Sequence, residues 1–179
     1  MSTLPEPSLM TVEQFDLLPE RQDVLEELHW GRLVAMSRPK AWHVKLQMKL
    51  TELLQPVAAG RGYIVMELPF RAVSEYELRD ADVAFVTKAR WDEANDGYLS
   101  GAPELVIEIL SPSNTKAQLR EYAALCLANG CEEFWIVNYK TKTISVTTCD
   151  GNSVEYSGGM DVPLTTLGGA SIRVDQIFA

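Results

Sequence analysis

Positively charged side chains are few in this sequence of 179 residues. Lysine and arginine together number 16 against 25 aspartates and glutamates, which gives a net charge of −9 at pH 7. A chain that is basic over its whole surface, the usual electrostatic footprint of a nucleic-acid-binding domain, is therefore excluded. Apolar runs are also short, and none approaches the roughly 18 residues of a membrane span, so we expect no membrane association.

Cysteine and histidine are scarce as well. The cysteines Cys126, Cys131 and Cys149 have no C-x-x-C spacing, which argues against a disulfide framework and against a thiolate zinc site. The histidines His29 and His43 lack a helical ligand spacing, so we expect no histidine zinc site. The start of the chain has no basic and apolar leader pattern. These features favour a protein of the reducing cytoplasm.

The composition is ordinary for a globular protein, and no repeat or linker divides the chain. We therefore expect a single domain over residues 1–179, with residues 1–10 as a loose arm. The order of elements predicts an α/β domain with a mixed sheet, in which a helical crossover makes residues 104–110 and 133–138 parallel strands. The predicted helices are 11–18, 39–58 and 115–129; the predicted strands are 25–29, 32–36, 63–68, 80–86, 104–110, 133–138, 143–148 and 153–156; residues 91–97 are a predicted loop, and 171–178 a strand or a helical turn.

Two acidic residues stand inside strands that are otherwise apolar. Asp82 interrupts residues 81–86, and Glu108 interrupts residues 105–110. A buried carboxylate without a partner costs several kcal/mol, so each must be paired, protonated, metal-bound or placed at an exposed strand end. An arginine such as Arg79 would be enough for one carboxylate. For two on neighbouring strands a shared Mg²⁺ or Mn²⁺ becomes the better explanation, because carboxylates repel each other unless a cation lies between them.

Three further polar residues carry less information on their own. Strand alternation places Glu67 on the face opposite its apolar neighbours, which favours exposure to solvent. His43 shares the apolar stripe of its predicted helix, which is typical of a histidine that is hydrogen-bonded at the edge of a core. The position of Glu27 beside the first predicted turn indicates little. No nucleophile elbow, phosphate loop or dinucleotide fingerprint is present.

Several motifs, in order along the chain, resemble the Uma2 family, bacterial proteins of the PD-(D/E)xK nuclease-like fold that are described as putative restriction endonucleases. Residues 104–113, ELVIEILSPS, are similar to the family's "lvvEvlSPS" and are the most specific match. The other matching segments are LEELHWGRLV at 25–34, SRP at 37–39 followed by His43, RDADVAFV at 79–86 and NGCEEFWIV at 129–137. The resemblance implies a restriction-endonuclease-like mixed β-sheet flanked by helices, with an N-terminal hairpin and extra C-terminal strands.

The same resemblance implies a divalent-metal phosphodiesterase centre that acts on DNA. In it Asp82 and Glu108 would hold Mg²⁺ or Mn²⁺, and the carbonyl oxygen of Ile109 would complete the shell. Glu27 would assist from the hairpin. Like many nuclease-fold proteins, the chain is expected to form a two-fold homodimer.

The chain departs from the family pattern at the lysine that normally orients or deprotonates the attacking water. Uma2-like proteins tend to carry this lysine on the helix after the glutamate, where this chain has Tyr122, and the tyrosine expected four residues later is Cys126. At about 100° per residue, Lys116 lies roughly 120° from Tyr122 around this helix and Arg120 roughly 160°, so neither replaces the lysine directly. Tyr122 is therefore the candidate for orienting the water.

Three hypotheses follow from these residues. The first is a Mg²⁺-dependent DNA endonuclease that is impaired by the loss of the lysine. The second is a non-catalytic module of the same fold that binds DNA or protein, and the third is a metal-dependent hydrolase of a small phosphoester, which would suit the acidic surface better. The metal site requires that the carboxylates of Asp82 and Glu108 converge, and it fails if they lie on opposite faces of the sheet.

Overall fold

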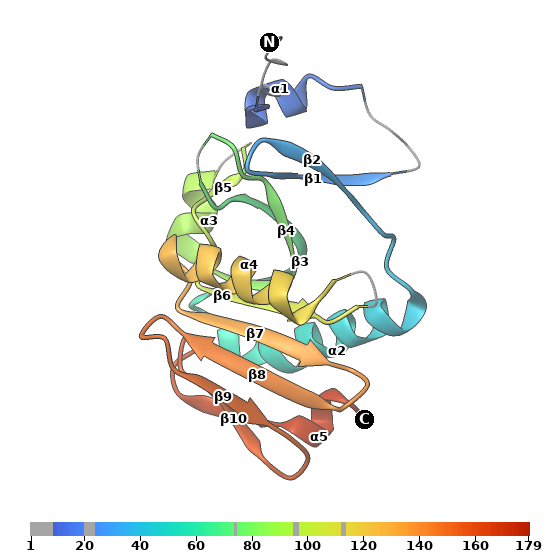
Figure 1. Cartoon of the computed structure of the whole chain (residues 1–179). Coiled ribbons are helices and arrows are strands. Elements are labelled where there is room, and N and C mark those ends of the chain that lie inside the picture. Colours follow the sequence, from blue (N-terminus) through green and yellow to red (C-terminus); the bar gives the residue numbers. More distant parts are fainter. Residues whose placement is uncertain (1–8, 20–23, 74, 95–96, 112–113) are drawn as a thin grey trace.

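A mixed seven-stranded sheet is the centre of the computed structural model, which describes residues 9–19, 24–73, 75–94, 97–111 and 114–179 (Figure 1). Its strand order is β5-β3-β4-β6-β7-β8-β9. Neighbouring strands are antiparallel except for the pairs β3–β5 and β6–β7, and the second of these confirms the predicted crossover. The strands are β3 (Gly62–Arg71), β4 (Arg79–Thr87), β5 (Leu99–Ser100), β6 (Leu105–Ile109), β7 (Glu133–Asn138), β8 (Thr143–Thr148) and β9 (Ser153–Tyr156).

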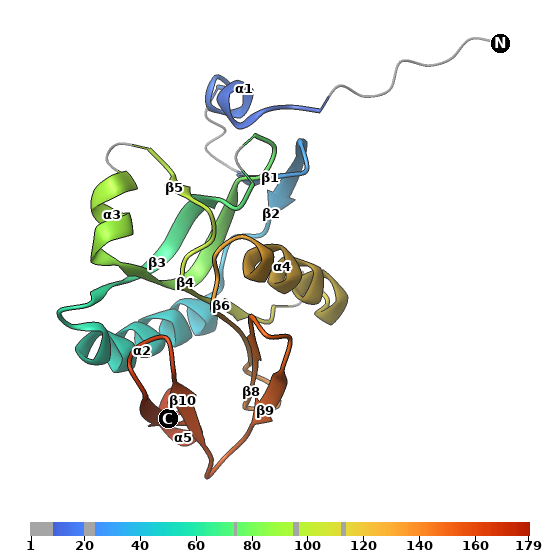
Figure 2. The same ribbon diagram turned by 90° about the vertical axis from the view of Figure 1, so that its left-hand side faces the viewer.

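Two long helices cover the two faces of this sheet (Figure 2). Helix α2 (Ala41–Ala58) packs on the face to which Val83 and Phe85 of β4 point. Helix α4 (Lys116–Ala128) packs on the other face, against a core that includes Ala84 and Val86. Successive strand residues point to opposite faces of a sheet. Because helices cover both faces here, residues 83–86 of β4 form a continuous apolar run. No helix in the described part of the chain is both long enough and apolar enough to span a membrane.

The C-terminal segment extends the core beneath α2 (Figure 2). Strands β10 (Asp161–Leu164) and β11 (Ala170–Arg173) form a separate antiparallel pair, and helix α5 (Val174–Ile177) follows directly. Their buried side chains, among them Val162 and Ile172, belong to the same core as α2. Residues 170–177 thus form a strand and then a helical turn, the two structures that the sequence offered as alternatives.

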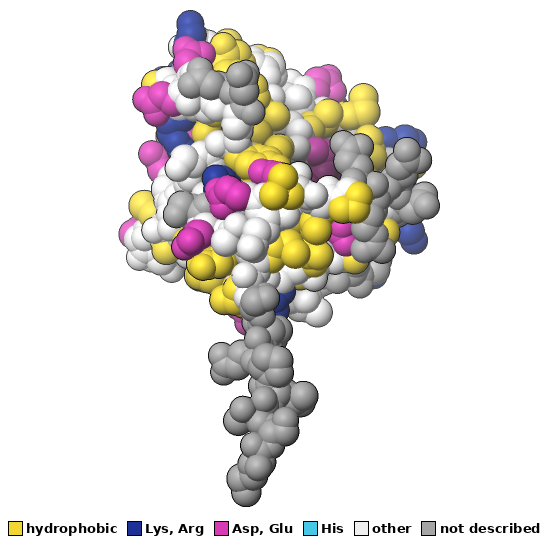
Figure 3. All heavy atoms as spheres, turned by 90° about the horizontal axis from the view of Figure 1, so that it is seen from above, with side chains coloured by type: hydrophobic (Ala, Val, Ile, Leu, Met, Phe, Trp, Pro, Cys, Tyr) yellow, Lys and Arg dark blue, Asp and Glu magenta, His cyan; other side chains and the backbone are white. Residues whose placement is uncertain are grey.

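A small N-terminal layer lies at the top of Figure 1 and consists of helix α1 (Val12–Asp16) and the hairpin of β1 (Leu25–His29) with β2 (Arg32–Met36). The backbones of Leu28 and Leu78 exchange two hydrogen bonds, of 3.0 and 2.9 Å, which attach this layer next to β4. Seen from above, hydrophobic side chains gather on this face of the molecule (Figure 3). The exposed ones in this layer include Leu17, Leu25, Trp30, Leu33 and Met36.

The predicted helix starts and hairpins, which depend on short stretches of sequence, are confirmed. Thr11 and Thr115 each begin a helix with a capping box, in which the threonine hydroxyl accepts from a backbone N–H and a glutamine three residues later accepts in return. Both predicted hairpins have the expected strand boundaries. These features depend on residues a few positions apart, so they can be recognised without knowledge of the fold.

One prediction needs correction, and another lies mostly outside the described residues. The predicted loop at residues 91–97 begins within helix α3 (Lys88–Ala94), because the helix formers at 88–94 are held by Arg90, which donates to the carbonyl oxygens of Ala102 and Ser100 at 2.8 and 2.7 Å. Most of the predicted loose arm lies outside the described residues. Met10 is held already, since its N–H donates to the carbonyl oxygen of Gly31 at 2.9 Å.

Candidate active site

Asp82 and Glu108 come from neighbouring strands and meet at one cavity. Strands β4 and β6 are antiparallel and pair Val83 with Ile107, so Asp82, which precedes Val83, lies opposite Glu108, which follows Ile107. The N–H of Asp82 donates to Glu108 Oε1 at 3.3 Å, and the N–H of Ile109 donates to Asp82 Oδ2 at 2.7 Å. Both side chains line a cavity of about 400 Å³. The two carboxylates therefore do not lie on opposite faces, the arrangement that would have excluded a shared metal.

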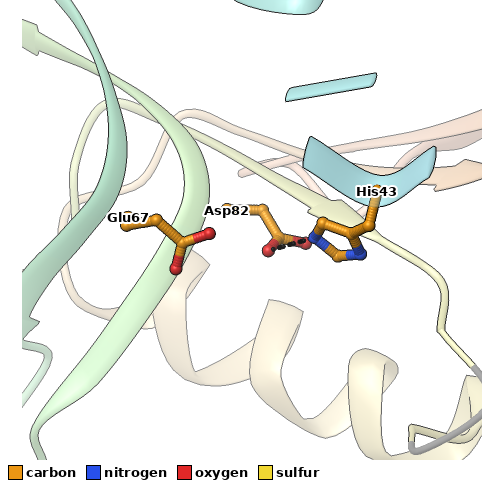
Figure 4. A group of neighbouring side chains, drawn as sticks. All are labelled: His43, Glu67 and Asp82. Atoms are coloured by element: carbon orange, nitrogen blue, oxygen red, sulfur yellow. Dashed lines mark hydrogen bonds and ion pairs between the residues drawn. The ribbon is translucent and has the colours of Figure 1, made fainter. Parts of the chain in front are cut away.

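Helix α2 presents two buried side chains to Asp82, one helical turn apart. His43 Nε2 lies 2.8 Å from Asp82 Oδ1 (Figure 4). The side-chain amide of Gln47 donates to the same oxygen at 3.1 Å. Gln47 also donates to the backbone carbonyl of Asp82 at 3.2 Å. These contacts fix the direction in which the Asp82 carboxylate points.

Glu67 joins the same group because the backbone of β3 is locally irregular. Its φ is +49°, and the register of β3 and β4 omits the pair that Glu67 would form with Asp82. Its side chain is exposed, as predicted, yet it accepts a hydrogen bond from Gln47. One ligand atom each of His43, Glu67 and Asp82 lie within 4.8 Å of one another. Glu67 is thus exposed to solvent and still belongs to the group of polar side chains around Asp82.

Burial and mutual repulsion disfavour the charged form of several acids in this cavity. Burial, followed by the charges of Asp82 and Glu27, raises the pKa of Glu108 well above its usual range. Burial also raises the pKa of Asp80 to about 7, with the charges of Glu27 and Glu67 adding to the effect. A cation in the cavity would remove this penalty, because it favours the ionised form of each carboxylate.

The pKa of His43 moves in the direction expected of a histidine among acids. Burial alone would lower it, but the hydrogen bond to Asp82 and the charge of Glu67 outweigh that effect and raise the pKa above its usual value. Carboxylate oxygens such as those of Asp82 and Glu108 suit Mg²⁺ or Mn²⁺, whereas the imidazole of His43 is hydrogen-bonded to Asp82. The residues present therefore fit the divalent cation that the sequence resemblance implies.

Glu27 enters the cavity from β1, in the N-terminal layer. Its Oε2 lies 2.5 Å from His29 Nε2 and 3.9 Å from the guanidinium of Arg79. Arg79 in turn forms an ion pair of 2.6 Å with the fully buried Glu77. The arginine proposed as a partner for a strand carboxylate thus pairs with Glu77 and approaches Glu27, and the two strand acids are left for another cation.

Tyr122 of α4 packs against the rings of Phe70 and Phe134 and lines a second cavity together with Glu27 and Glu108. Its hydroxyl donates to the carbonyl oxygen of Asp80 at 3.4 Å, and the guanidinium of Arg79 lies 5.1 Å from the centre of its ring. Burial raises the pKa of Tyr122 well above its usual value, so it keeps its proton at any physiological pH. Lys116 is exposed at the start of α4 and is not among the described residues that line either cavity.

The sequence did not single out Gln47 or Asp80, although each carried a usable signal. Gln47 follows His43 by four positions, which places both on one face of a helix. Asp80 precedes Asp82 by two positions, which places both on one side of a strand. Polar residues in register with a candidate ligand are therefore worth including when a site is predicted from sequence.

The raised pKa of Asp80 predicts a stability that depends on pH in the metal-free protein. The unfolded chain releases this proton near pH 3.8 and the folded protein near 7, so the folded state loses stability as pH rises through this window. We expect Asp80→Asn to unfold at higher urea concentration than wild type above pH 7, by about 2 kcal/mol in free energy of unfolding once partial solvent screening is allowed for.

The measurement is urea unfolding in EDTA at a series of pH values. The exposed Asp92 of α3 provides the control, because Asp92→Asn should follow the wild-type curve. Curves of Asp80→Asn and wild type that stay parallel from pH 4 to 8 would contradict the assignment.

Comparisons with known proteins are consistent with this geometry. A profile of the Uma2 family, described as "Putative restriction endonuclease", matches residues 12–175. Among solved structures, the chain is similar to "a putative nuclease belonging to DUF820" from Anabaena variabilis, with a TM-score of 0.81 and 19% sequence identity, over 94% of this chain and 97% of that chain. No curated protein matches. At this identity the structural likeness establishes the fold alone, which is the fold that the sequence predicted.

Proposed function

Since the chain belongs to the Uma2 family, whose profile matches residues 12–175, we propose that it is a divalent-metal-dependent endonuclease that hydrolyses phosphodiester bonds of DNA. The observation that supports this most is that Asp82 and Glu108, from two neighbouring strands, line one cavity together with further acids. The absence of the family lysine leads us to expect slow hydrolysis.

In this proposal Asp82 and Glu108 hold Mg²⁺ or Mn²⁺, and Glu27 assists from β1. When bound, such an ion lowers the pKa of a coordinated water and offsets charge on the phosphate. His43 and Gln47 are positioning residues, since they orient the Asp82 carboxylate through contacts of 2.8 and 3.1 Å. Outer contacts of this kind keep a metal ligand in one orientation and strengthen its binding.

Tyr122 is our candidate for orienting the attacking water. Tyr122 lines the second cavity together with Glu108, and its raised pKa keeps the proton on the hydroxyl oxygen. A hydroxyl in that state donates a hydrogen bond but does not act as a base. General bases typically contribute about 10² to 10⁴ in rate, and their loss is the physical reason for expecting slow hydrolysis.

The alternative is a module of this fold that binds DNA or protein without cleaving. The observation that favours it is Tyr122 itself, because an aromatic residue with buried neighbours stands where the resemblance places a cation. The net charge of −9 also gives the chain no general affinity for DNA. The two functions differ in one measurable respect, which is hydrolysis.

Purified protein is expected to nick supercoiled plasmid and to cut circular single-stranded DNA when Mn²⁺ is present, and EDTA is expected to stop both reactions. Binding without cleavage, by wild type and by Tyr122→Lys alike, would instead support the non-catalytic module. Hydrolysis of bis(p-nitrophenyl) phosphate with no cleavage of either DNA would favour a hydrolase of small phosphoesters.

A two-fold homodimer and a location in the bacterial cytoplasm stay predictions. Sedimentation equilibrium checks the first of these, with twice the chain mass of 20.0 kDa as the expected result and the mass of a single chain as the contradicting one.

A further inference from the structure

An aromatic pair stands beside the cavity that holds the acids. The rings of Trp42 and Tyr139 are stacked, with centroids 5.1 Å apart and an angle of 26° between their planes. Trp42 lies in the first turn of α2 and also lines the cavity with Asp82 and Glu108. Tyr139 follows directly on β7, and Figure 1 shows the turn after β7 beside the beginning of α2.

Tyr139 remains accessible although it is stacked. It is 47% exposed, whereas Trp42 is half-buried and packs against the main core. The pair is therefore a ring anchored in the core that supports a second ring facing solvent. Flat apolar surface of this kind can stack with another planar ring, and nucleic-acid bases are planar rings that stack on aromatic side chains.

Basic side chains surround this pair in a chain that is otherwise acidic. Lys40 precedes α2 and lines the cavity, while Lys140 and Lys142 lie in the turn that begins with Tyr139. All three are exposed, and within the described residues none forms an ion pair with a carboxylate. The N-terminus of α2 has no side-chain cap, so its partial positive charge adds to that of Lys40. Positive charge is thus concentrated on the two segments that carry Trp42 and Tyr139.

We propose that Trp42 and Tyr139 form a stacking platform for an unpaired base of single-stranded DNA, with Lys40 and Lys140 binding the flanking phosphates. The inference rests on the proposed function, because it places this base next to the phosphodiester that the acids would bind. Stacking on a side chain requires a base that is not paired, and a duplex would need a longer basic stripe than these few lysines supply. The preferred substrate is therefore single-stranded or locally unpaired DNA.

The test is the affinity for a fluorescein-labelled oligothymidylate, measured by anisotropy in Ca²⁺ so that binding is observed apart from hydrolysis. Tyr139→Ala is expected to weaken binding about 10-fold, and Tyr139→Phe to leave it unchanged, because loss of one stacked base typically costs about 1 to 3 kcal/mol. Lys140→Gln is expected to reduce the slope of log affinity against log salt by about one phosphate contact, roughly 0.7 for a single strand.

The chain offers matched controls for both variants. Tyr63 is 39% exposed and packs against Trp91 at 5.6 Å, in a second aromatic pair between β3 and α3 that does not line either described cavity. Tyr63→Ala should therefore leave the affinity unchanged. Lys88 is exposed on α3, and Lys88→Gln should leave the salt slope unchanged.

Equal losses in Tyr139→Ala and Tyr63→Ala would overturn the platform, as would equal affinity of wild type for the single strand and for a duplex of the same length. These outcomes do not depend on hydrolysis. Selective weakening by Tyr139→Ala in a protein that cuts no DNA in Mn²⁺ would support the platform and contradict the endonuclease, whereas plasmid nicking without that selective weakening would do the reverse.

Discussion

Replacing Glu108 by glutamine is expected to abolish DNA cleavage and to stabilise the metal-free protein at the same time. The variant loses a metal ligand, and with it at least about 1000-fold in Mn²⁺-dependent nicking, which corresponds to about 4 kcal/mol of transition-state stabilisation. It also loses a carboxylate whose pKa is raised by burial and by the charge of Asp82. Glutamine has the same shape and cannot ionise, so the cost of burying the charge disappears.

The sign of the stability change depends on pH. The unfolded chain releases the Glu108 proton near its ordinary pKa of 4.5, whereas the folded protein holds this proton to a higher pH. Above pH 4.5 the wild type therefore loses stability that the variant keeps, and the difference grows as pH rises. We expect Glu108→Gln to be more stable by about 1 to 3 kcal/mol at pH 8 in EDTA, measured by urea unfolding.

Glu104 is a matched control, because it is 8% exposed like Glu108 and lies just before the same strand. Its carboxylate already has partners: Arg90 at 3.3 Å and the hydroxyl of Thr87 at 2.7 Å. Glu104→Gln should therefore destabilise the protein and leave nicking unchanged. If Glu108→Gln were also destabilising, the charge of Glu108 would have a partner other than a metal, and if it still nicked DNA, the centre would lie elsewhere.

Replacing Tyr122 by lysine is expected to increase Mn²⁺-dependent nicking about 100-fold, because it puts a cation where the family resemblance expects one and lets an amine act on the water. The same change should lower stability by about 3 kcal/mol. The new ammonium would be buried between Phe70 and Phe134, close to the guanidinium of Arg79. Nicking rates and urea unfolding of the same preparation check the two effects.

Tyr122→Phe separates the hydroxyl from the ring. It keeps the packing against Phe70 and Phe134 and removes only the group that donates to the carbonyl oxygen of Asp80. We expect a loss of a few-fold in nicking if the hydroxyl orients water. Equal rates for wild type and Tyr122→Phe would contradict that role, and an inactive Tyr122→Lys variant would argue that the fold has become a binding module.

The sequence predicted the features that depend on local residue order or on one element at a time. One example is Thr115, which together with Gln118 matches the capping-box pattern. Others are Asp82 and Glu108, which are noticeable because their neighbours in sequence are apolar. The sequence predicted that these two acids meet because their strands were expected to be neighbours, and the register of β4 and β6 places them opposite each other.

What the sequence did not reveal depends on how distant elements pack. The spacing of Gln47 from His43 is visible in the sequence, but whether Gln47 reaches Asp82 depends on where α2 crosses the sheet. Glu67 turns toward the site through a backbone with φ of +49°, an uncommon conformation for glutamate that strand alternation does not anticipate. Helix α3 was missed because its stabilising contacts come from residues beyond its own end.

The attachment of the N-terminal layer gives the molecule two levels of stability. Among the residues that the structure describes, the cluster that holds this layer contains three buried hydrophobic residues, Val12, Leu28 and Leu78, whereas each face of the sheet has a far larger core. A unit with so little buried apolar surface opens at a lower free energy than the global unfolding of the domain. Glu27 belongs to this unit, so it can leave the cavity while Asp82 and Glu108 stay in place on the sheet.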